Sequence, residues 1–347
     1  MDSNKKNYPQ IAIIILNWNG KQDTIECLES LYQITYPNYE VVLIDNHSTD
    51  ESIEGVKKWA DGEILVESKF FEYNRYSKPI KYLEYTREES EKGAGKELGF
   101  TQMPSNRKII IIRNEKNYGF AEGNNIGIRY ALRSLAVNYV LLLNNDTVVD
   151  KKFLEELINV AENNEKIGVI GPKLYFYEKP QIIQTTGVNI DFWTGRTIPV
   201  NFMKTDNDLN TSNNQLLYVD YVYGACFLIN RNVIENVGFL DPTYFLYGEE
   251  TDWCLRIKRA GYIVVCNLRS KIWHKSMASS SKTSRFSIYY PARNRVMVMR
   301  KYSSLFKFLS FVIFYPIYNI IIFLNNKKWM NIGCFLRGFI DGLFMKK

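Results

Sequence analysis

Cysteine and histidine are scarce in this chain, which contains five cysteines and two histidines among 347 residues. The cysteines are odd in number, and none is close enough to another to form a zinc-binding pair or a redox dithiol. A disulfide framework is therefore not expected, and a reducing cytosol fits this usage best. The five are Cys27, Cys226, Cys254, Cys266 and Cys334.

Two common nucleotide-binding motifs are also missing. No Gly-x-Gly-x-x-Gly follows the first apolar run, and no Gly-Lys-Ser/Thr loop occurs, so dinucleotide-binding and P-loop folds lose their main support.

The first apolar run, residues 11–16, follows Lys5 and Lys6 but is too short for a signal-peptide core. We expect it to form a buried first strand.

An excess of positive charge is missing from most of the chain. Residues 1–295 contain 36 basic and 36 acidic residues, whereas residues 296–347 contain eight Lys or Arg and one acid. This distribution argues against a nucleic-acid groove in the main domain. It places the net charge of +7 beside an apolar tail, where anionic lipid would attract it.

The chain is rich in short apolar runs separated by segments with helical periodicity. This alternation predicts an α/β fold with a mostly parallel, Rossmann-like sheet flanked by helices. We expect one catalytic domain over residues 1–300. The runs are residues 11–16, 41–44, 108–112, 139–143 and 167–170.

Two regions interrupt the alternation. Residues 61–108 mix aromatic and charged side chains and contain Gly93-Ala94-Gly95, which predicts an insertion of partly ordered loop. Residues 196–216 are rich in Asn and Asp and predict a second, polar loop.

Residues 301–347 form a tail of different character. Residues 305–324 are long enough to span a bilayer, although Lys307, Pro316 and Asn319 weaken a simple spanning helix. A buried helical hairpin is the alternative. We favour a membrane-associating tail because Lys327 and Lys328 would meet anionic headgroups. An amphipathic pattern follows at Phe335, Leu336, Phe339, Ile340, Leu343 and Phe344.

Polar residues follow several predicted strands. Asn-Trp-Asn-Gly occupies residues 17–20, Asp45 directly follows the second strand, and Asn-Asn-Asp at 144–146 ends the fourth. Ligands of open α/β sheets bind at the carboxyl ends of the strands. Asp146 could hold a divalent cation on a diphosphate, and a polar turn is the alternative of equal weight.

Gly119 to Asn125 open another predicted helix, whose amides either face a phosphate or sugar or simply cap the helix. A later helix begins near Glu249 and ends before Gly261. Glu250 lies on the apolar face of this helix, where partial desolvation of its carboxylate would make it a usable proton acceptor. Glu249 and Asp252 lie on the other face, where acids commonly complement the helix dipole.

His274 follows an apolar segment. A lone histidine is more often structural, but a further metal ligand supplied from outside the sheet would also have this pattern.

Together these motifs resemble family 2 of the inverting glycosyltransferases, with the nucleotide-diphospho-sugar transferase (GT-A) fold, and within it the rhamnosyltransferase-like branch. The resemblance covers residues 9–60 and 110–300. It implies a hexosyl- or deoxyhexosyltransferase that needs Mg²⁺ or Mn²⁺ and acts in cell-surface polysaccharide biosynthesis. Its partners would be a nucleotide-sugar donor and a glycan or polyprenyl-linked acceptor. The tail suggests a location at the cytoplasmic face of the cell membrane.

The resemblance also implies residue roles. Asp146 and His274 would bind the metal, and Glu250 or, less favoured, Asp252 would be the catalytic base. The donor would be bound by Asn19, Asp45, Gly119, Asn124, Asn144, Asn145, Gly224, Ala225, Tyr290 and Arg293.

The sequence departs from the family pattern at two positions. Asn144 replaces the first Asp of the metal-binding element, and Glu250 stands where Asp is usual. Two alternative functions are a polyprenyl-phosphate sugar synthase, which needs no base, and a membrane-surface scaffold that binds nucleotide sugar without turnover.

Overall fold

The computed structural model describes residues 8–93, 99–100, 102–209, 215–275 and 285–345. Within them, eleven strands form one mixed sheet and two more form a hairpin. The sheet strands are β1 Ile11–Asn17, β2 Tyr39–Asp45, β3 Lys81–Thr86, β4 Lys108–Arg113, β5 Tyr139–Asn144, β6 Thr147–Val149, β7 Ile167–Phe176, β8 Ile183–Thr185, β11 Leu216–Tyr218, β12 Cys226–Asn230 and β13 Ile263–His274. The hairpin is β9 Val188–Asp191 and β10 Arg196–Pro199.

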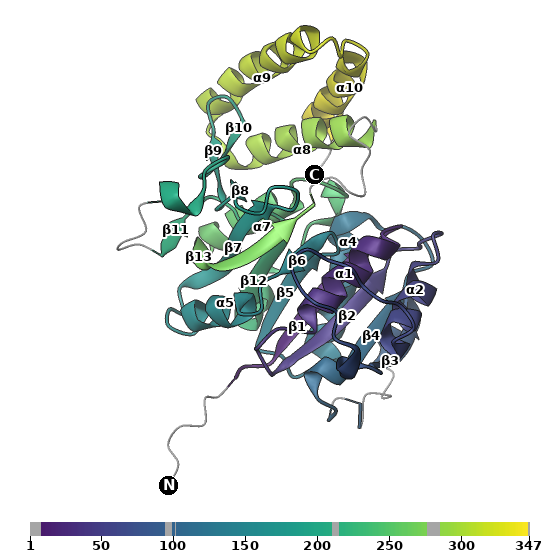
Figure 1. Cartoon of the computed structure of the whole chain (residues 1–347). Helices are drawn as coiled ribbons and strands as arrows, with labels where there is room; N and C mark the ends of the chain where they lie inside the picture. The colour runs from purple at the N-terminus through teal and green to yellow at the C-terminus, as the bar shows by residue number, and fades with distance from the viewer. Residues whose placement is uncertain (1–7, 94–98, 101, 210–214, 276–284, 346–347) are drawn as a thin grey trace.

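Helices pack on both faces of the sheet, and three C-terminal helices gather at one end of the molecule (Figure 1). The helices are α1 Lys21–Leu31, α2 Ser52–Asp61, α3 Arg87–Lys92, α4 Gly119–Ser134, α5 Phe153–Ala161, α6 Arg231–Val237, α7 Glu249–Arg259, α8 Phe286–Tyr302, α9 Leu305–Asn325 and α10 Asn331–Phe344. Short 3₁₀ turns lie at Arg75–Ser77, Ser105–Arg107, Asp206–Asp208 and Pro242–Tyr244.

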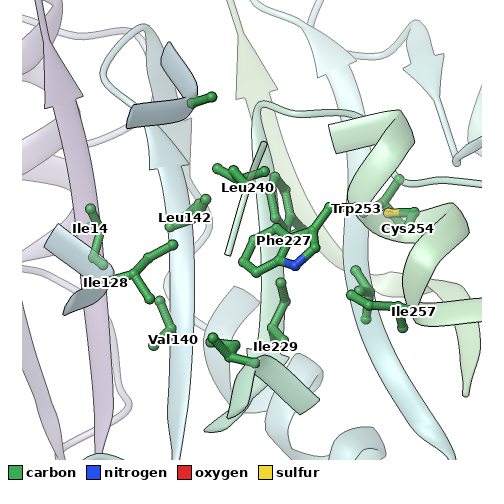
Figure 2. Close-up of a cluster of buried hydrophobic side chains, with 14 of the residues drawn as sticks. Ile14, Ile128, Val140, Leu142, Phe227, Ile229, Leu240, Trp253, Cys254 and Ile257 are labelled. Atoms are coloured by element: carbon green, nitrogen blue, oxygen red, sulfur yellow. The ribbon is translucent and has the colours of Figure 1, made fainter. Parts of the chain in front are cut away.

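The continuous apolar strands bury both of their faces. In β1, Ile13 and Ile15 point into a core shared with α1, α2 and α5, whereas Ile14 points into the core on the other side. Figure 2 shows this second core. In it, Ile14 and Leu142 of the sheet lie near Ile128 of α4, and Trp253 of α7 packs beside Phe227 of β12. Burial on both faces explains why these runs do not alternate with polar residues.

The strand order is β11-β13-β7-β12-β5-β1-β2-β4-β3. The five predicted runs correspond to β1, β2, β4, β5 and β7, which confirms the predicted α/β fold with its mostly parallel sheet. A further strand, β12, was not predicted; it is short and pairs antiparallel with both β5 and β7.

Both regions expected to be loops contain regular structure, so those expectations were wrong in part. Within residues 61–108, β3 extends the sheet as a parallel edge strand on β4, and α3 follows it. Within residues 196–216, β10 closes the hairpin and Leu216 begins β11.

Helix α8 crosses the predicted domain boundary at residue 300, and α10 packs back against it. The two helices approach closely at glycines: a Cβ on Gly338 would lie 2.4 Å from the Tyr289 carbonyl oxygen. Phe335 and Phe339, two residues of the predicted amphipathic pattern, are only 2% and 7% exposed and pack inward. Among the described helices, α9 is the one long and apolar enough to cross a membrane.

Candidate functional site

The carboxyl ends of β1, β2 and β5 lie side by side, as the parallel register requires. Asn17 pairs with Asp45, and Leu16 pairs with Asn144. The Asn17 side-chain amide donates to Asp45 Oδ1 at 3.1 Å and to Ser48 Oγ at 3.0 Å. Asp45, which is 3% exposed, is therefore held at this carboxyl edge of the sheet.

Asn19 joins the loops that follow β1 and β2. Its backbone has a φ of 52°, its N–H donates to Ser48 Oγ at 3.0 Å, and its side-chain oxygen accepts from the Thr49 N–H at 2.7 Å. Asn tolerates this left-handed conformation better than most residues. Trp18 beside it is 44% exposed, so an aromatic face is accessible at the carboxyl edge.

Asn144 and Asn145 fix the turn that precedes Asp146. The Asn144 N–H donates to the Ala225 carbonyl at 2.8 Å. The Asn145 amide donates to Asn17 Oδ1 at 3.1 Å and to Thr24 Oγ1 at 2.9 Å. Asn17, which the sequence analysis did not select, thus links Asp45 to the Asn-Asn-Asp turn.

Asp146 and His274 come together although 128 positions separate them. Antiparallel pairing of Thr147 in β6 with His274 in β13 brings His274 Nε2 to 3.3 Å from Asp146 Oδ1. His274 is the last residue of β13 and belongs to the sheet, which corrects the expectation that it comes from outside it.

The surroundings favour an ionised Asp146. Burial raises the pKa of Asp146, but the charge and hydrogen bonding of His274 outweigh this effect and hold the pKa below its usual value. Apart from the imidazole contact, Asp146 Oδ1 has no hydrogen-bond partner although it is buried. A buried carboxylate oxygen without a donor is costly unless a cation approaches it.

Gln184 orients the imidazole of His274. Its Oε1 lies 3.0 Å from His274 Nδ1. Metal-binding histidines commonly donate their second ring N–H to such an oxygen, which leaves the other nitrogen as the ligand. Gln184 lies in β8, and no sequence motif marked it.

The pair Asp146 and His274 fits a divalent cation whose remaining ligands are water and phosphate oxygens. Within the described ranges, no group of three or more His, Cys, Asp or Glu side chains could hold a metal ion. A cation here would therefore depend on the donor diphosphate for part of its coordination.

Helix α7 presents Glu249 and Glu250 in different surroundings. Glu250 is partly exposed, and its Oε2 accepts from the Gly248 N–H at 3.1 Å. Glu249 is 4% exposed, and its Oε2 has no hydrogen-bond partner. Burial raises the pKa of both carboxyl groups, and the charge of Glu250 raises that of Glu249 further.

Gly224 and Tyr223 lie close to Glu250. A Cβ added to Gly224 would lie 3.6 Å from Glu250 Cγ, so the backbone passes directly beside this carboxylate. Burial raises the pKa of Tyr223, and the charges of Glu250 and Asp146 contribute further. Tyr223 also meets the His274 ring edge-on, with centroids 5.8 Å apart. These contacts connect α7 to the Asp146–His274 pair.

Asp252 has a different environment from Glu250. It is fully buried and accepts from Arg256 at 2.8 Å and from Lys301 of α8 at 2.6 Å. The Tyr302 hydroxyl also donates to it, at 2.8 Å. Burial raises the pKa of Asp252, but these partners outweigh it and lower the pKa overall.

Asp252→Asn is expected to lower the free energy of unfolding at neutral pH by about 3 kcal/mol, because it breaks buried ion pairs. The folded-state pKa is depressed, so this stability is present above the unfolded pKa of about 3.9 and is lost as pH falls through the folded value. Denaturant midpoints compared at neutral and strongly acidic pH would test this. Glu235→Gln, which removes an exposed pair with Arg231, should change stability by less than about 1 kcal/mol.

Gly119 begins α4 where the chain passes Phe245. Its φ is 78°, and a Cβ would lie 2.5 Å from the Phe245 ring, so both the conformation and the close contact require glycine. The Asn124 amide donates to the Phe120 carbonyl at 2.9 Å within the same helix.

Tyr290 and Arg293 lie on α8 beside the turn that precedes α7. Tyr290 stacks on Phe245 with centroids 5.2 Å apart, and the Arg293 guanidinium lies 4.8 Å from the Tyr290 ring centroid. Arg293 also donates to the carbonyls of Thr243 and Tyr244, at 2.6 and 3.0 Å. Residues 276–284, between His274 and α8, lie outside the described residues.

These features define a GT-A fold, in which a mixed and mostly parallel sheet carries polar residues at its carboxyl edge. The structure is similar to a mannosyltransferase from Pyrobaculum calidifontis solved with GDP-Man and Mn²⁺, with a TM-score of 0.56 and 12% identity over 99% of this chain and 89% of that one. It is also similar to GalNAc-T7 solved with UDP, GalNAc and Mn²⁺, with a TM-score of 0.59 and 16% identity over 98% of this chain and 57% of that one.

The family profile described as Glycosyl transferase family 2 matches residues 12–82 and 86–238, and the chain belongs to that family. The matched residues include Asp45, Asp146 and Gly224 but end before Glu250 and His274.

Curated relatives include the low-salt glycan biosynthesis hexosyltransferase Agl10 of Haloferax volcanii, 28% identical over 56% of this chain. They also include the dTDP-rhamnosyl transferase RfbF of Shigella flexneri, 24% identical over 56% of this chain. The chain spans 62% and 64% of the lengths of these two proteins.

Proposed function

We propose that this protein is a metal-dependent inverting glycosyltransferase that moves a sugar from a nucleotide-diphosphate donor to an acceptor hydroxyl. The observation that carries the proposal is the buried pair Asp146 and His274 at the carboxyl edge of the sheet, with Glu250 nearby across Tyr223. The names of the relatives support a hexose or deoxyhexose as the transferred sugar and a glycan as the product.

The donor is proposed to lie along the carboxyl edge. Asp45 has a polar, fixed position suited to a base or ribose, and the glycine backbone at 224 leaves room for the sugar beside Glu250. Asp146 and His274 would hold a divalent cation, which would supply positive charge to stabilise the leaving diphosphate. The remaining proposed donor-binding residues are Asn19, Gly119, Asn124, Asn144, Asn145, Ala225, Tyr290 and Arg293.

The proposed reaction is a single displacement. Glu250 accepts the proton of the acceptor hydroxyl as its oxygen attacks the anomeric carbon. The bond from that carbon to the diphosphate oxygen breaks, the nucleoside diphosphate leaves with the bonding electron pair, and the anomeric configuration inverts. Asp252 is held by Arg256 and Lys301, so its proposed part is to position α7 against α8.

The acceptor is proposed to be a glycan or a polyprenyl-linked sugar at the cytoplasmic face of the cell membrane. The apolar helix α9 and the basic character of residues 296–347 support that location.

Gln184→Leu is expected to weaken metal binding, because it removes the oxygen that orients His274. Loss of such a partner typically costs 10- to 100-fold in metal affinity or activity, so the Mn²⁺ concentration for half-maximal transfer should rise by about that factor. The measurement is a Mn²⁺ titration at saturating donor. Gln181→Leu, in the turn before β8, serves as the matched control, and an equal effect of both substitutions would contradict the role of Gln184.

A further inference from the structure

One side of α9 is exposed and apolar. Its residues recur every three or four positions, the spacing that places side chains along one face of a helix. Their side chains are between 50% and 69% exposed, far more than packing inside a protein leaves accessible. We call them the α9 stripe: Leu305, Leu309, Ile313, Ile317, Ile321 and Leu324.

The opposite side of α9 packs on the protein. Phe311 is fully buried and contacts Gly195 between β9 and β10, where an added Cβ would lie 2.4 Å from its ring. Tyr315 meets Phe335 and Phe339 of α10, with ring centroids 5.6 and 6.3 Å apart. The helix is therefore held in one orientation, with the stripe directed away from the body.

The sequence around the stripe carries positive charge. Residues 305–340 contain Lys307, Lys327, Lys328 and Arg337 and no acid. The next acid, Asp341, accepts a hydrogen bond from the Tyr289 hydroxyl at 2.7 Å. Trp329, which directly follows the two lysines in the sequence, is 67% exposed and adds a large apolar side chain beside them.

We propose that the α9 stripe docks on an anionic lipid surface with α9 lying in the plane of the interface. This inference rests on the proposed membrane location but does not depend on sugar transfer. Apolar side chains entering the acyl boundary, flanked by lysines at the headgroups, match the chemistry of an interfacial helix.

The contacts of the β9–β10 hairpin favour an in-plane helix over a spanning one. Lys307 lies 5.8 Å from the Trp193 ring centroid, and Arg196 lies 5.1 Å from that of Tyr318, so the tip of the hairpin packs against α9. The hairpin lies beside the start of α9 (Figure 1). A spanning α9 would therefore carry the charged side chain of Arg196 toward hydrocarbon, where it is strongly disfavoured.

The charge pattern also favours lipid over a second copy of the chain. A two-fold symmetric dimer joins the same surface of each copy. It would join two segments that each carry Lys307, Lys327 and Lys328, with no acid within residues 305–340 to offset their charge.

The test is flotation of the full-length protein with vesicles, without donor or acceptor. Wild type should bind vesicles of phosphatidylcholine mixed with phosphatidylglycerol more tightly than phosphatidylcholine alone. Ile313→Asp combined with Ile317→Asp should weaken binding about 100-fold, at roughly tenfold per lost apolar contact. Lys327→Glu combined with Lys328→Glu should remove most of the preference for anionic vesicles.

Leu65→Asp is the matched control, because Leu65 is 68% exposed but lies outside the tail, and it should bind like wild type. Each variant's thermal unfolding should match that of wild type. Vesicle binding that is unchanged by the stripe substitutions would overturn the proposal. So would a stripe-dependent dimer seen by light scattering, or retention of wild type in cell membranes after alkaline carbonate, which marks a spanning helix. Transfer to a soluble acceptor by the stripe variant separates loss of docking from failure of the proposed chemistry.

Discussion

Asp146→Asn is expected to lower kcat/KM for metal-dependent transfer by roughly 10²- to 10⁴-fold, since a metal ion on a leaving group is worth several kcal/mol. The substitution keeps the shape of the side chain but removes the charge that faces His274 at 3.3 Å. Because the described part of the chain brings no third His, Cys, Asp or Glu to this pair, no other carboxylate would replace the lost charge. Steady-state kinetics at saturating Mn²⁺ would measure the loss.

Asp150→Asn provides the control for that experiment. Asp150 follows the same turn and β6, but its carboxylate accepts from the Lys152 N–H rather than facing the site. This variant should retain wild-type kinetics. Full activity of Asp146→Asn with a native unfolding midpoint would exclude Asp146 as the metal ligand.

Glu250→Gln is expected to lower kcat by about 10²- to 10⁴-fold, the usual contribution of a positioned base. Burial raises the pKa of Glu250, and the base must be ionised to act. The acid limb of kcat/KM should therefore lie above about pH 4.3, the ordinary value for glutamate, and activity should fall as pH drops through the raised pKa. A pH profile of wild type measures this limb.

Glu249→Gln separates a specific base from a general effect of charge on α7. Burial and the charge of Glu250 raise the pKa of Glu249, which favours its neutral form, and glutamine mimics that form. We expect this variant to keep most of its activity. If Glu250→Gln also keeps most of its activity, the acceptor is better described as a phosphate, as in a polyprenyl-phosphate sugar synthase.

Much of the catalytic fold was predictable because both faces of its central strands are buried. Residues 11–16 and 139–143 form uninterrupted apolar runs, and each becomes a fully covered strand. Edge strands lack this signal. In β3, Lys81, Tyr82 and Thr86 are exposed, so residues 81–86 resembled a charged loop.

A position at the carboxyl edge of the sheet was predictable where a residue ends a strand or lies in the turn after it, as Asp45 and Asp146 do. Side chains that act through others were missed. Gln184 is positioned by the short strand β8, and Asn17 acts by joining Asp45 to Asn145, a role that depends on parallel register rather than on local sequence. In the tail, periodicity identified an apolar face in α10 but could not show that Phe335 and Phe339 pack on α9.

The most direct test of the proposed function is release of nucleoside diphosphate from a panel of nucleotide sugars, measured with the full-length protein in Mn²⁺ and again in excess chelator. A metal-dependent glycosyltransferase should turn over at least one hexose or deoxyhexose donor in Mn²⁺, and this turnover should be lost in chelator. Donor turnover that is unchanged by the chelator, or donor binding without turnover in the presence of lipid-linked acceptors, would contradict the proposed function.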